Sequence, residues 1–428
     1  MSDDADNTTS AGVGATSTSE ILAIPAVRRY LLSTAFAAIG QNLLITVLFK
    51  QVFDITGDEW DIGLVGLAQF VPALLLVLVS GWVADRFDRR RITALFMSGR
   101  GLSAVALVVF SLSGSQAVWQ LFAIAFALGT ADAMMMPSRR SIAPLLAESS
   151  LFPRIIAIWA GTFTGASIFG PILGGFLYSA GASWAYGVAA ACQFAAILPI
   201  LRITYHREPE RNTDRPTWSS AIEGLRFVRR TPVVLGTITL DLFAVLFGGA
   251  VALIPAIASE RLGVGEIAYG FLRSAPGIGA AAMAVWLTLH PLKRHVGRTL
   301  LTVVAIFGAG HIVFGLTTNY AAAFIALVVV SAADMISMNI RSAIVPLVTP
   351  DDQLGRVNAV EGVFIGASNE LGAFESGAAA RVFGLPWAIA GGGIITVAIA
   401  GLTALAFPAL RKIDTFESLR PDPDVSDR

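Results

Sequence analysis

Apolar runs of roughly 20 residues recur along the whole chain, which is the length an α-helix needs to cross a hydrocarbon core about 30 Å thick. Twelve can be counted, over residues 27–52, 62–84, 92–112, 117–138, 155–179, 184–201, 233–258, 267–289, 299–317, 320–340, 357–383 and 387–410. Hydrophobic residues make up 55% of the chain and charged residues 14%, unlike a soluble domain. We predict an all-α integral membrane protein with twelve transmembrane helices.

Residues of the first half recur in the second half at a constant offset. The pairs Asp132 and Asp334, Met136 and Met338, Arg139 and Arg341, Pro144 and Pro346, and Arg154 and Arg356 are each 202 positions apart. Several residue types kept in register indicate an internal structural repeat, a common way to build transporters. The repeat predicts two pseudo-symmetric six-helix bundles.

The distribution of polar residues predicts the domain organisation. Arginine and lysine gather in alternate loops, which places both termini in the cytoplasm. The first residues are rich in Ser, Thr and Asp and lack a basic start, so they resemble a disordered tail more than a signal peptide. We expect a cytoplasmic tail over 1–23, an N-terminal bundle over 24–203, a cytoplasmic linker with an amphipathic helix over 204–231, a C-terminal bundle over 232–411 and a second cytoplasmic tail over 412–428.

Several functional classes find no support in the sequence. The chain carries 30 basic and 30 acidic side chains, so its net charge indicates no nucleic-acid partner. Cys192 is the only cysteine and excludes an intramolecular disulfide. The four histidines lack metal-motif spacing, and no nucleophile elbow, Walker loop or dinucleotide fingerprint is present. We therefore expect no enzyme activity, no cofactor and no metal site.

A charged cassette follows the second apolar run. It reads Gly-Trp-Val-Ala-Asp-Arg-Phe-Asp-Arg-Arg-Arg over residues 81–91, and it resembles the loop signature of the major facilitator superfamily. Val83 and Asp88 depart from that signature, and Asp88 puts the loop backbone in question. The resemblance implies a cytoplasmic gate in which the loop meets a helix N-terminus of the other half, with that of the 357–383 helix as the candidate. The gating residues would be Gly81, Asp85, Arg86, Arg89, Arg90 and Arg91.

A second resemblance is more specific. Residues 333–341, 349–357 and 364–377 resemble the enterobactin (siderophore) exporter branch of the superfamily, with departures at Glu361 and Ala373. The predicted fifth helix also resembles, in part, the glycine-proline motif of drug and proton antiporters. The residues concerned are Gly170, Pro171, Gly174 and Gly175, and simple helix packing with a proline kink explains them equally well.

Charged residues inside the membrane helices are costly and normally face a partner or water. Asp132 and Arg139 are seven positions apart, as are Asp334 and Arg341. Seven positions correspond to about 10.5 Å along a helix. We expect that distance to prevent direct pairing, so each residue needs a partner on another helix. A buried ionic lock and a role in transport are equally good interpretations.

The predicted eleventh helix carries Glu361 and Glu375 near one face, and two such carboxylates suit a proton-coupled cycle. Asp132, Asp334 and Asp241 are further proton-coupling candidates. Arg273 and Asp241 are the remaining deep charges, and either is a candidate partner for a carboxylate of that helix. Polar residues expected to line a central cavity are Gln41, Asn42, Thr46 and Asn369, although interhelical hydrogen bonding would also explain them.

These observations predict a secondary active transporter of the cytoplasmic membrane, working as a monomer. It would export a small molecule, a siderophore or related metabolite or drug, by proton antiport with alternating access, and its other partner would be the lipid bilayer. The alternatives are a broad multidrug efflux pump, a proton-coupled nutrient importer and a non-transporting membrane sensor.

Overall fold

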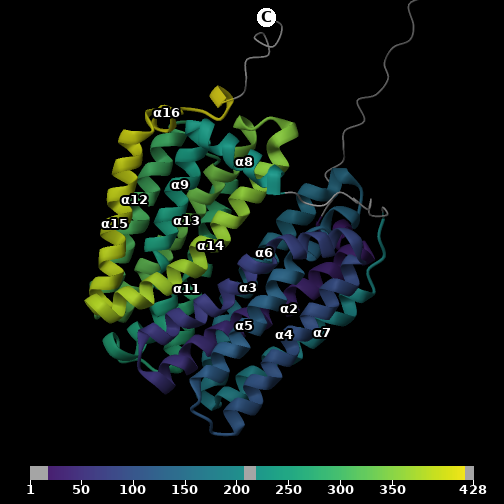
Figure 1. Ribbon diagram of the computed structural model, residues 1–428, viewed down its shortest axis with the longest axis vertical. Helices are drawn as coiled ribbons and strands as arrows, with labels where there is room; N and C mark the ends of the chain where they lie inside the picture. Colours follow the sequence, from purple (N-terminus) through teal and green to yellow (C-terminus); the bar gives the residue numbers. More distant parts are fainter. Residues whose placement is uncertain (1–17, 207–217, 420–428) are drawn as a thin grey trace, which may run out of the picture.

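The computed structural model describes residues 18–206 and 218–419, which are helical and contain no β-strand. Figure 1 shows two bundles side by side, one built from the first half of the chain and one from the second. The all-α fold expected from the apolar runs is confirmed.

The first bundle contains six long helices preceded by the short α1 (Thr18–Ala23). They are α2 (Pro25–Thr56), α3 (Glu59–Arg86), α4 (Arg89–Leu112), α5 (Val118–Arg140), α6 (Phe152–Ala180) and α7 (Ala182–Leu201). The second bundle contains α9 (Pro232–Phe247), α11 (Glu266–Leu289), α12 (Val296–Leu316), α13 (Tyr320–Val348), α14 (Asp351–Phe383) and α15 (Leu385–Ala406), with α8 (Trp218–Arg230) before it and α16 (Pro408–Arg411) after it.

Eleven helical segments in the described ranges are long and apolar enough to cross a membrane. The remaining predicted span, 357–383, corresponds to α14, a helix of 33 residues whose polar residues lower its hydropathy. Its neighbours are α3, α9 and α15, so α14 is enclosed by helices that qualify as spans. A polar helix in that position faces protein and cavity more than lipid.

The predicted span 233–258 lies within one candidate membrane span, Pro232–Arg261, although its helix type changes along its length. After α9 ends at Phe247, the chain passes through the short η3 (Gly249–Leu253), α10 (Ile254–Ala256) and η4 (Ile257–Arg261). A Cβ atom on Gly249 would lie 2.5 Å from the backbone of Gly372, so the break brings the chain against α14. Its counterpart in the first bundle, α2, runs unbroken for 32 residues.

The two bundles have matching interiors. In the first bundle α2 packs against α6 and α7, and in the second α9 packs against α14 and α15. The pairs α4 with α5 and α4 with α7 correspond to α12 with α13 and α12 with α15. These equivalent contacts are what the offset of 202 residues predicts for a duplicated unit.

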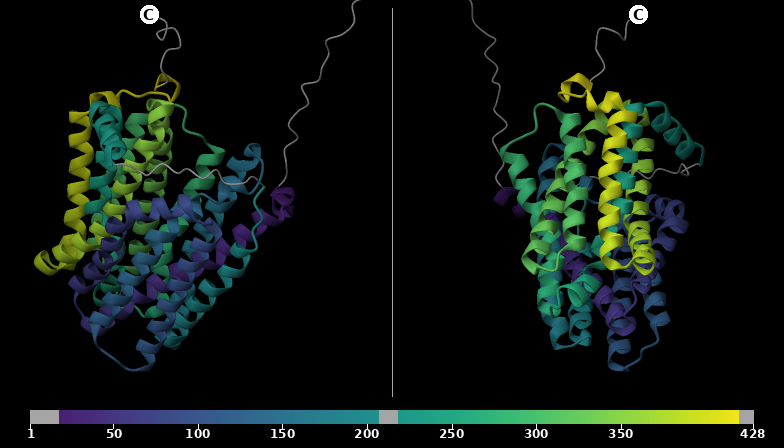
Figure 2. Two further views of the ribbon diagram at one scale, coloured as in Figure 1. Left: turned by 45° about the vertical axis from the view of Figure 1, so that its right-hand side comes forward. Right: turned by 90° about the vertical axis from the view of Figure 1, so that its left-hand side faces the viewer.

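The two bundles touch along two seams, α6 against α11 and α3 against α14. We call the end of the molecule with Glu59, Ala180 and Glu266 the far end, and the end with α1, α8 and α16 the linker end. Figures 1 and 2 show the bundles diverging towards the linker end. Consistently, Gly161 of α6 and Gly362 of α14, on the linker-end halves of their helices, have no atom within 4 Å of an added Cβ.

Two glycine crossings form the seams near the far end. A Cβ atom on Gly270 of α11 would lie 2.9 Å from the Cα of Gly175, and one on Gly377 of α14 would lie 2.9 Å from the Cα of Gly63. Gly175 and Gly377 are themselves 202 positions apart. The bundles are thus joined at the far end by two pseudo-equivalent backbone contacts.

Candidate functional site

The charged loop between α3 and α4 is built around Asp88, the residue that departs from the family signature. Asp88 caps α4 by accepting a hydrogen bond from the Arg90 N–H at 2.9 Å, and its carboxylate takes two more from the Arg90 side chain. These hydrogen bonds from Arg90 hold the pKa of Asp88 below its usual value. The aspartate gives the loop an ordinary helix cap, so the expected disturbance of the backbone does not occur.

The arginines of the loop have partners within the first bundle. Arg89 donates to the Ser141 carbonyl at 3.1 Å, and Arg90 donates to the Ile203 carbonyl at 2.7 Å while lying over the Tyr205 ring. Arg86 lies 5.5 Å from the Trp82 ring. Arg91 is exposed, and Gly81 is partly buried within α3.

Asp85 does not bridge the two halves in this conformation. It has no hydrogen bond or ion pair with any residue that the structure describes. Helix α3 meets α14 near Glu59 and Gly63, at the opposite end from Asp85. Among the described residues, the structure therefore does not show the expected contact of Asp85 with the N-terminus of α14.

The equivalent loop of the second bundle has lost its aspartate but is held by one from elsewhere. Asp414, just after α16, accepts a hydrogen bond from the His295 backbone N–H at 3.0 Å and lies 3.5 Å from the Arg294 Nε. The backbone bond from His295 lowers the pKa of Asp414. A Cβ on Gly297 would lie 1.8 Å from the Leu410 carbonyl oxygen, so glycine is needed there.

In the first bundle the intramembrane aspartate has partners on two other helices. Asp132 on α5 lies 3.2 Å from the Arg100 Nε on α4 and accepts a hydrogen bond from the Gln41 Nε2 on α2 at 3.1 Å. Arg139 does not pair with it, and its Nη2 atom is buried without a partner among the described residues. Sequence reasoning missed Arg100, although a lone arginine inside the 92–112 apolar run was a visible signal.

In the second bundle Arg341 lies between two carboxylates. It is ion-paired with Asp241 of α9, and both side chains are less than 10% exposed. Its other terminal nitrogen is 3.9 Å from Asp334, so the expectation that seven residues prevent a contact was wrong here. Long side chains on a helix lean towards its N-terminus, which shortens the gap between Arg341 and Asp334.

The expected pairing of Arg273 and Asp241 with α14 carboxylates was also wrong. Asp241 pairs with Arg341, and Arg273 donates to the Val251 carbonyl at 2.6 Å with its guanidinium 5.9 Å from the Phe49 ring. Glu361 and Glu375 are partly buried on α14, and neither forms an ion pair with a described side chain. The side chain of Asn369 lies outside the described residues.

A central cavity of about 350 Å³ lies between the two halves. Its polar lining comes from six helices, namely Gln41 of α2, Gln69 of α3, Asp132 of α5, Arg273 of α11, His311 of α12, and Ser331 and Asp334 of α13. A second hollow of about 300 Å³ shares Ile45, Val251, Arg273, Ser331 and Asp334 with it. Asn42 and Thr46 line the second hollow, so the predicted α2 residues do gather at the centre. Sequence reasoning missed Gln69 and His311.

The glycine-proline motif of α6 serves close packing. A Cβ on Gly170 would lie 2.6 Å from the Asn42 side chain, and one on Gly174 would lie 3.4 Å from the Leu43 carbonyl oxygen. Gly175 forms the far-end crossing with α11, and Pro171 lines the smaller hollow. The packing interpretation accounts for all four residues.

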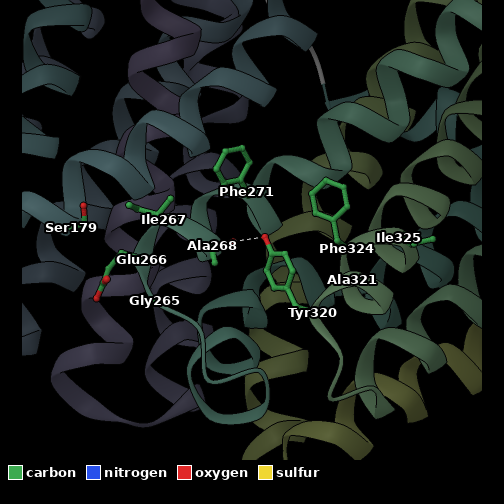
Figure 3. A pocket seen from close by; sticks show the side chains of 10 residues that line it. All are labelled: Ser179, Gly265, Glu266, Ile267, Ala268, Phe271, Tyr320, Ala321, Phe324 and Ile325. Atoms are coloured by element: carbon green, nitrogen blue, oxygen red, sulfur yellow. Dashed lines mark hydrogen bonds between the residues drawn. The ribbon is translucent and has the colours of Figure 1, made fainter.

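The largest hollow, about 850 Å³, is an apolar groove at the far end and is separate from the central charges. Figure 3 shows Ile267, Phe271, Phe324 and Ile325 lining it, with the Tyr320 hydroxyl donating to the Ala268 carbonyl. Because it lacks a polar cluster, we place the candidate site in the central cavity. No group of His, Cys, Asp and Glu in the described ranges could hold a metal ion.

Comparison with known proteins agrees with this architecture. Residues 22–426 match the transmembrane secretion effector family. The chain is 26% identical to the enterobactin exporter EntS of Escherichia coli O1:K1 over 344 residues, 78% of this chain and 80% of that protein. It is also 26% identical to the enterobactin exporter EntS of Salmonella choleraesuis over 419 residues, 94% of this chain and 96% of that protein.

Solved structures share the fold at low sequence identity. A bacterial homolog of the human lysosomal transporter Spinster, in an inward-facing and unoccupied conformation, superposes with a TM-score of 0.68 at 17% identity, covering 93% of this chain and 98% of that chain. A POT family transporter in complex with a thioalcohol-conjugated peptide gives a TM-score of 0.71 at 12% identity, covering 90% and 96%.

Proposed function

Because the chain belongs to the transmembrane secretion effector family of major facilitator transporters, we propose that it exports a small molecule by proton antiport. The export direction and the substrate class, a siderophore or related metabolite, follow from its similarity to enterobactin exporters over most of its length. The proposed location is the cytoplasmic membrane, with both termini and the linker end in the cytoplasm.

Alternating access is supported by the arrangement of the two bundles. They touch at the far end and diverge at the linker end, which in the proposed orientation is a cytoplasm-facing conformation. A substrate would reach the central cavity from the cytoplasm, and opening of the far-end seams with closure of the linker end would release it outside. Asp85 would then meet α14 and hold the closed linker end.

The observation that carries proton coupling is the position of Asp334. Arg341 supplies one positive charge to two carboxylates, Asp241 and Asp334. Asp241 shares a buried pair with Arg341, whereas the side chain of Asp334 is 47% exposed and lines the cavity. The cluster has one negative charge in excess, so one proton neutralises it, and Asp334 is the carboxylate that water in the cavity can reach.

Coupling then requires that proton and substrate favour different states of the same cavity. A deprotonated Asp334 leaves the cavity wall negative and available to substrate donor groups, whereas a protonated Asp334 removes that attraction. Outside, where protons are abundant, protonation would promote substrate release. This difference of affinities between states is what a gradient needs to drive export.

Transport by purified protein in liposomes tests the proposal. With enterobactin as the first probe, an imposed proton gradient should drive its movement and the movement of substrate should dissipate the gradient. Asp334→Asn should abolish gradient-driven transport yet permit exchange of labelled for unlabelled enterobactin. Asp414→Asn, at an exposed carboxylate outside the cavity, is the matched control and should transport normally.

Untargeted mass spectrometry on cells and medium addresses the natural substrate. A strain lacking the protein should retain inside a metabolite that the complemented strain releases, and dependence on iron supply would indicate a siderophore. Full gradient-driven transport by Asp334→Asn contradicts the coupling assignment. A medium component left unconsumed by the deleted strain contradicts export.

A further inference from the structure

The central cavity contains two buried hydrogen-bond acceptors that no described residue satisfies, one from each half. They are the Gln41 Oε1 atom on α2 and the His311 Nε2 atom on α12. Buried polar atoms are normally hydrogen-bonded, because an unsatisfied one costs free energy. Two such atoms, on residues that line one cavity from opposite halves, therefore indicate groups kept for a ligand.

The orientation of the Gln41 amide follows from its partner. The Asp132 carboxylate can only accept, so the Gln41 side chain turns its Nε2 towards Asp132 Oδ2 at 3.1 Å. That contact leaves Oε1, an acceptor with no donor in the described protein. Asp132 in turn forms an ion pair with Arg100. Arg100 therefore positions Asp132, and Asp132 orients the Gln41 amide.

The tautomer of His311 follows in the same way. Its Nδ1 lies 3.0 Å from the Phe307 carbonyl oxygen, one turn earlier on α12, and a carbonyl oxygen only accepts. Nδ1 therefore carries a hydrogen, and Nε2 of the neutral ring has a lone pair. The residue is 1% exposed, and burial without an ion-pair partner favours the neutral ring. Packing on Phe307, with ring centroids 4.5 Å apart, fixes the plane of the imidazole.

Of the ionisable residues around His311, two carboxylates and one arginine line the cavity. The neighbouring helix α13 presents Asp334 and Arg341, α9 presents Asp241 already paired with Arg341, and α15 contains no ionisable residue. Across the cavity lie Asp132, already paired with Arg100, and Arg273. Of these, Arg273 is the cavity-lining donor, and it is already engaged with the Val251 carbonyl.

We propose that Gln41 Oε1 and His311 Nε2 are substrate-binding atoms, and that the cavity takes a molecule with at least two hydroxyl or N–H donors bridging the two halves. This assignment rests on the proposed export function, because it names the class of molecule carried by the same cavity. A substrate bonded to both halves would also sense their relative movement. Methylation of its donors should remove the recognition.

Equilibrium binding to the full-length protein in nanodiscs tests the proposal with two matched probes. One is 2,3-dihydroxybenzamide, which has two phenolic donors, and the other is 2,3-dimethoxybenzamide, which has neither. Wild-type protein should prefer the hydroxylated probe by roughly tenfold, the discrimination expected from about one well-placed hydrogen bond. The ratio of the two affinities, more than either affinity, is the readout, since a purely structural defect would weaken both.

Three variants test whether His311 causes the preference for the hydroxylated probe. His311→Phe keeps an aromatic ring on Phe307 but removes the acceptor, and the preference should fall to about twofold or less. His311→Gln supplies an amide oxygen and should recover most of the preference. The control is Thr396→Val on α15, where a buried hydroxyl bonded to its own helix is removed outside the cavity, and the preference should remain as in wild type.

The melting temperature of each variant shows whether it folds. If His311→Phe does not fold, the preference of His311→Gln for the hydroxylated probe tests the role of Nε2. An undiminished preference in a folded His311→Phe protein overturns the role of Nε2. Equal binding of both probes by wild type, or binding of neither, overturns the acceptor-rich assignment. None of these results concerns export, which the enterobactin flux and metabolite measurements report separately.

Discussion

At the scale of single residues, the ion pair between Arg341 and Asp241 is buried. The cost of removing one partner depends on the buried charge that remains on the other. Asp241→Asn leaves a buried guanidinium whose remaining carboxylate, Asp334, lies 3.9 Å away. Breaking a buried pair typically costs about 3–5 kcal/mol, whereas replacing both partners by neutral groups costs much less. We expect Asp241→Asn to lower the melting temperature markedly and the double variant with Arg341→Gln to recover part of the loss.

Thermal unfolding of the detergent-solubilised protein measures this difference. The comparison variant is Asp54→Asn. Like Asp241, Asp54 pairs with a basic side chain, that of Lys50 near the far end, but it also accepts a hydrogen bond from the Tyr178 hydroxyl. Equal destabilisation by Asp241→Asn and by the double variant would show that the pair, and not the orphaned charge, sets the cost.

Asp88 gives a pH dependence at the linker end. Its pKa is lowered in the folded protein because the Arg90 side chain hydrogen-bonds the carboxylate. A lowered pKa means that the contribution to stability is complete above the unfolded value of about 3.9 and is lost as the pH falls through the folded pKa. Asn also caps helices, so Asp88→Asn removes the charge but keeps a cap.

We expect Asp88→Asn to be slightly less stable than wild type at pH 7, by about 1 kcal/mol or less for a partly exposed pair. The two melting temperatures should converge as the pH is lowered below 4, and a difference that did not shrink as the pH fell would exclude ionisation of Asp88 as its cause. Arg89, which bonds a backbone carbonyl, is the matched position, because Arg89→Gln should give a difference that does not vary over this range.

The sequence revealed which residues are charged inside the membrane but not which of them meet. Spacing along one helix is a one-dimensional measure, and it failed for Asp334 and Arg341 because a long side chain leans along the helix. It also could not reveal that Arg100 on α4 faces Asp132 on α5, since partners on different helices depend on helix rotation. His311 escaped attention because a lone histidine in an apolar run has no motif.

At the scale of helices, the two glycine crossings at the far end set how closely the bundles approach. A Cβ on Gly377 would lie 2.6 Å from the Glu59 carbonyl oxygen, and one on Gly175 would lie 2.5 Å from the Glu266 carbonyl oxygen. Both obstacles are backbone atoms that cannot rotate away. A side chain added at such a contact destabilises the protein by about 1–3 kcal/mol. This cost applies only to the conformation in which the far end is closed.

Gly377→Val should therefore shift the population towards a conformation with the far end open and slow the transport cycle. The measurement is labelling of Thr46→Cys by a membrane-impermeant maleimide from outside, in a Cys192→Ser background. Thr46 is buried beneath the seam, where its carbonyl accepts a hydrogen bond from Tyr269 of the other bundle. Labelling should accelerate roughly tenfold or more, in line with that energy.

Gly161→Val is the matched control, because Gly161 has no atom within 4 Å of an added Cβ. It should label at the wild-type rate. Unchanged labelling in Gly377→Val would mean that the seam relaxes around the new side chain and does not govern opening.

Helix boundaries were predictable to the extent that they follow hydropathy. The predicted span 233–258 lies within the candidate membrane span Pro232–Arg261, but its apolar composition hides the break after Phe247, where Gly248 and Gly249 let Phe307 and Gly372 approach. The polarity of α14 had the opposite effect. The count of apolar runs includes 357–383, although α14 does not qualify as a span by composition.

At the scale of the whole molecule, the duplicated unit explains why the two seams are equivalent and the two charge clusters are not. The repeat keeps the carboxylate and the arginine in register, as Asp132 with Arg139 and Asp334 with Arg341. Asp241 on α9 gives the second bundle an additional carboxylate, whereas Arg100 on α4 gives the first an additional arginine. In the proposed mechanism, structural symmetry supports the movement of the two bundles, and the difference in charge sets the second bundle apart for coupling.

The contact of Asp58 with Arg381 joins the two halves at the far end, with Oδ2 and Nη1 3.4 Å apart. If transport requires this end to open, a covalent link between these positions must stop the cycle. We expect oxidation of an Asp58→Cys, Arg381→Cys pair in a Cys192→Ser background to abolish enterobactin flux into or out of liposomes, and reduction to restore it.

The second bundle provides the control, since His295 and Asp414 lie in contact within that one half. Oxidation of a His295→Cys, Asp414→Cys pair should leave flux intact, because it links parts that move together. Continued flux through a protein verified as cross-linked between the halves would show that substrate crosses without separation of the far-end seams.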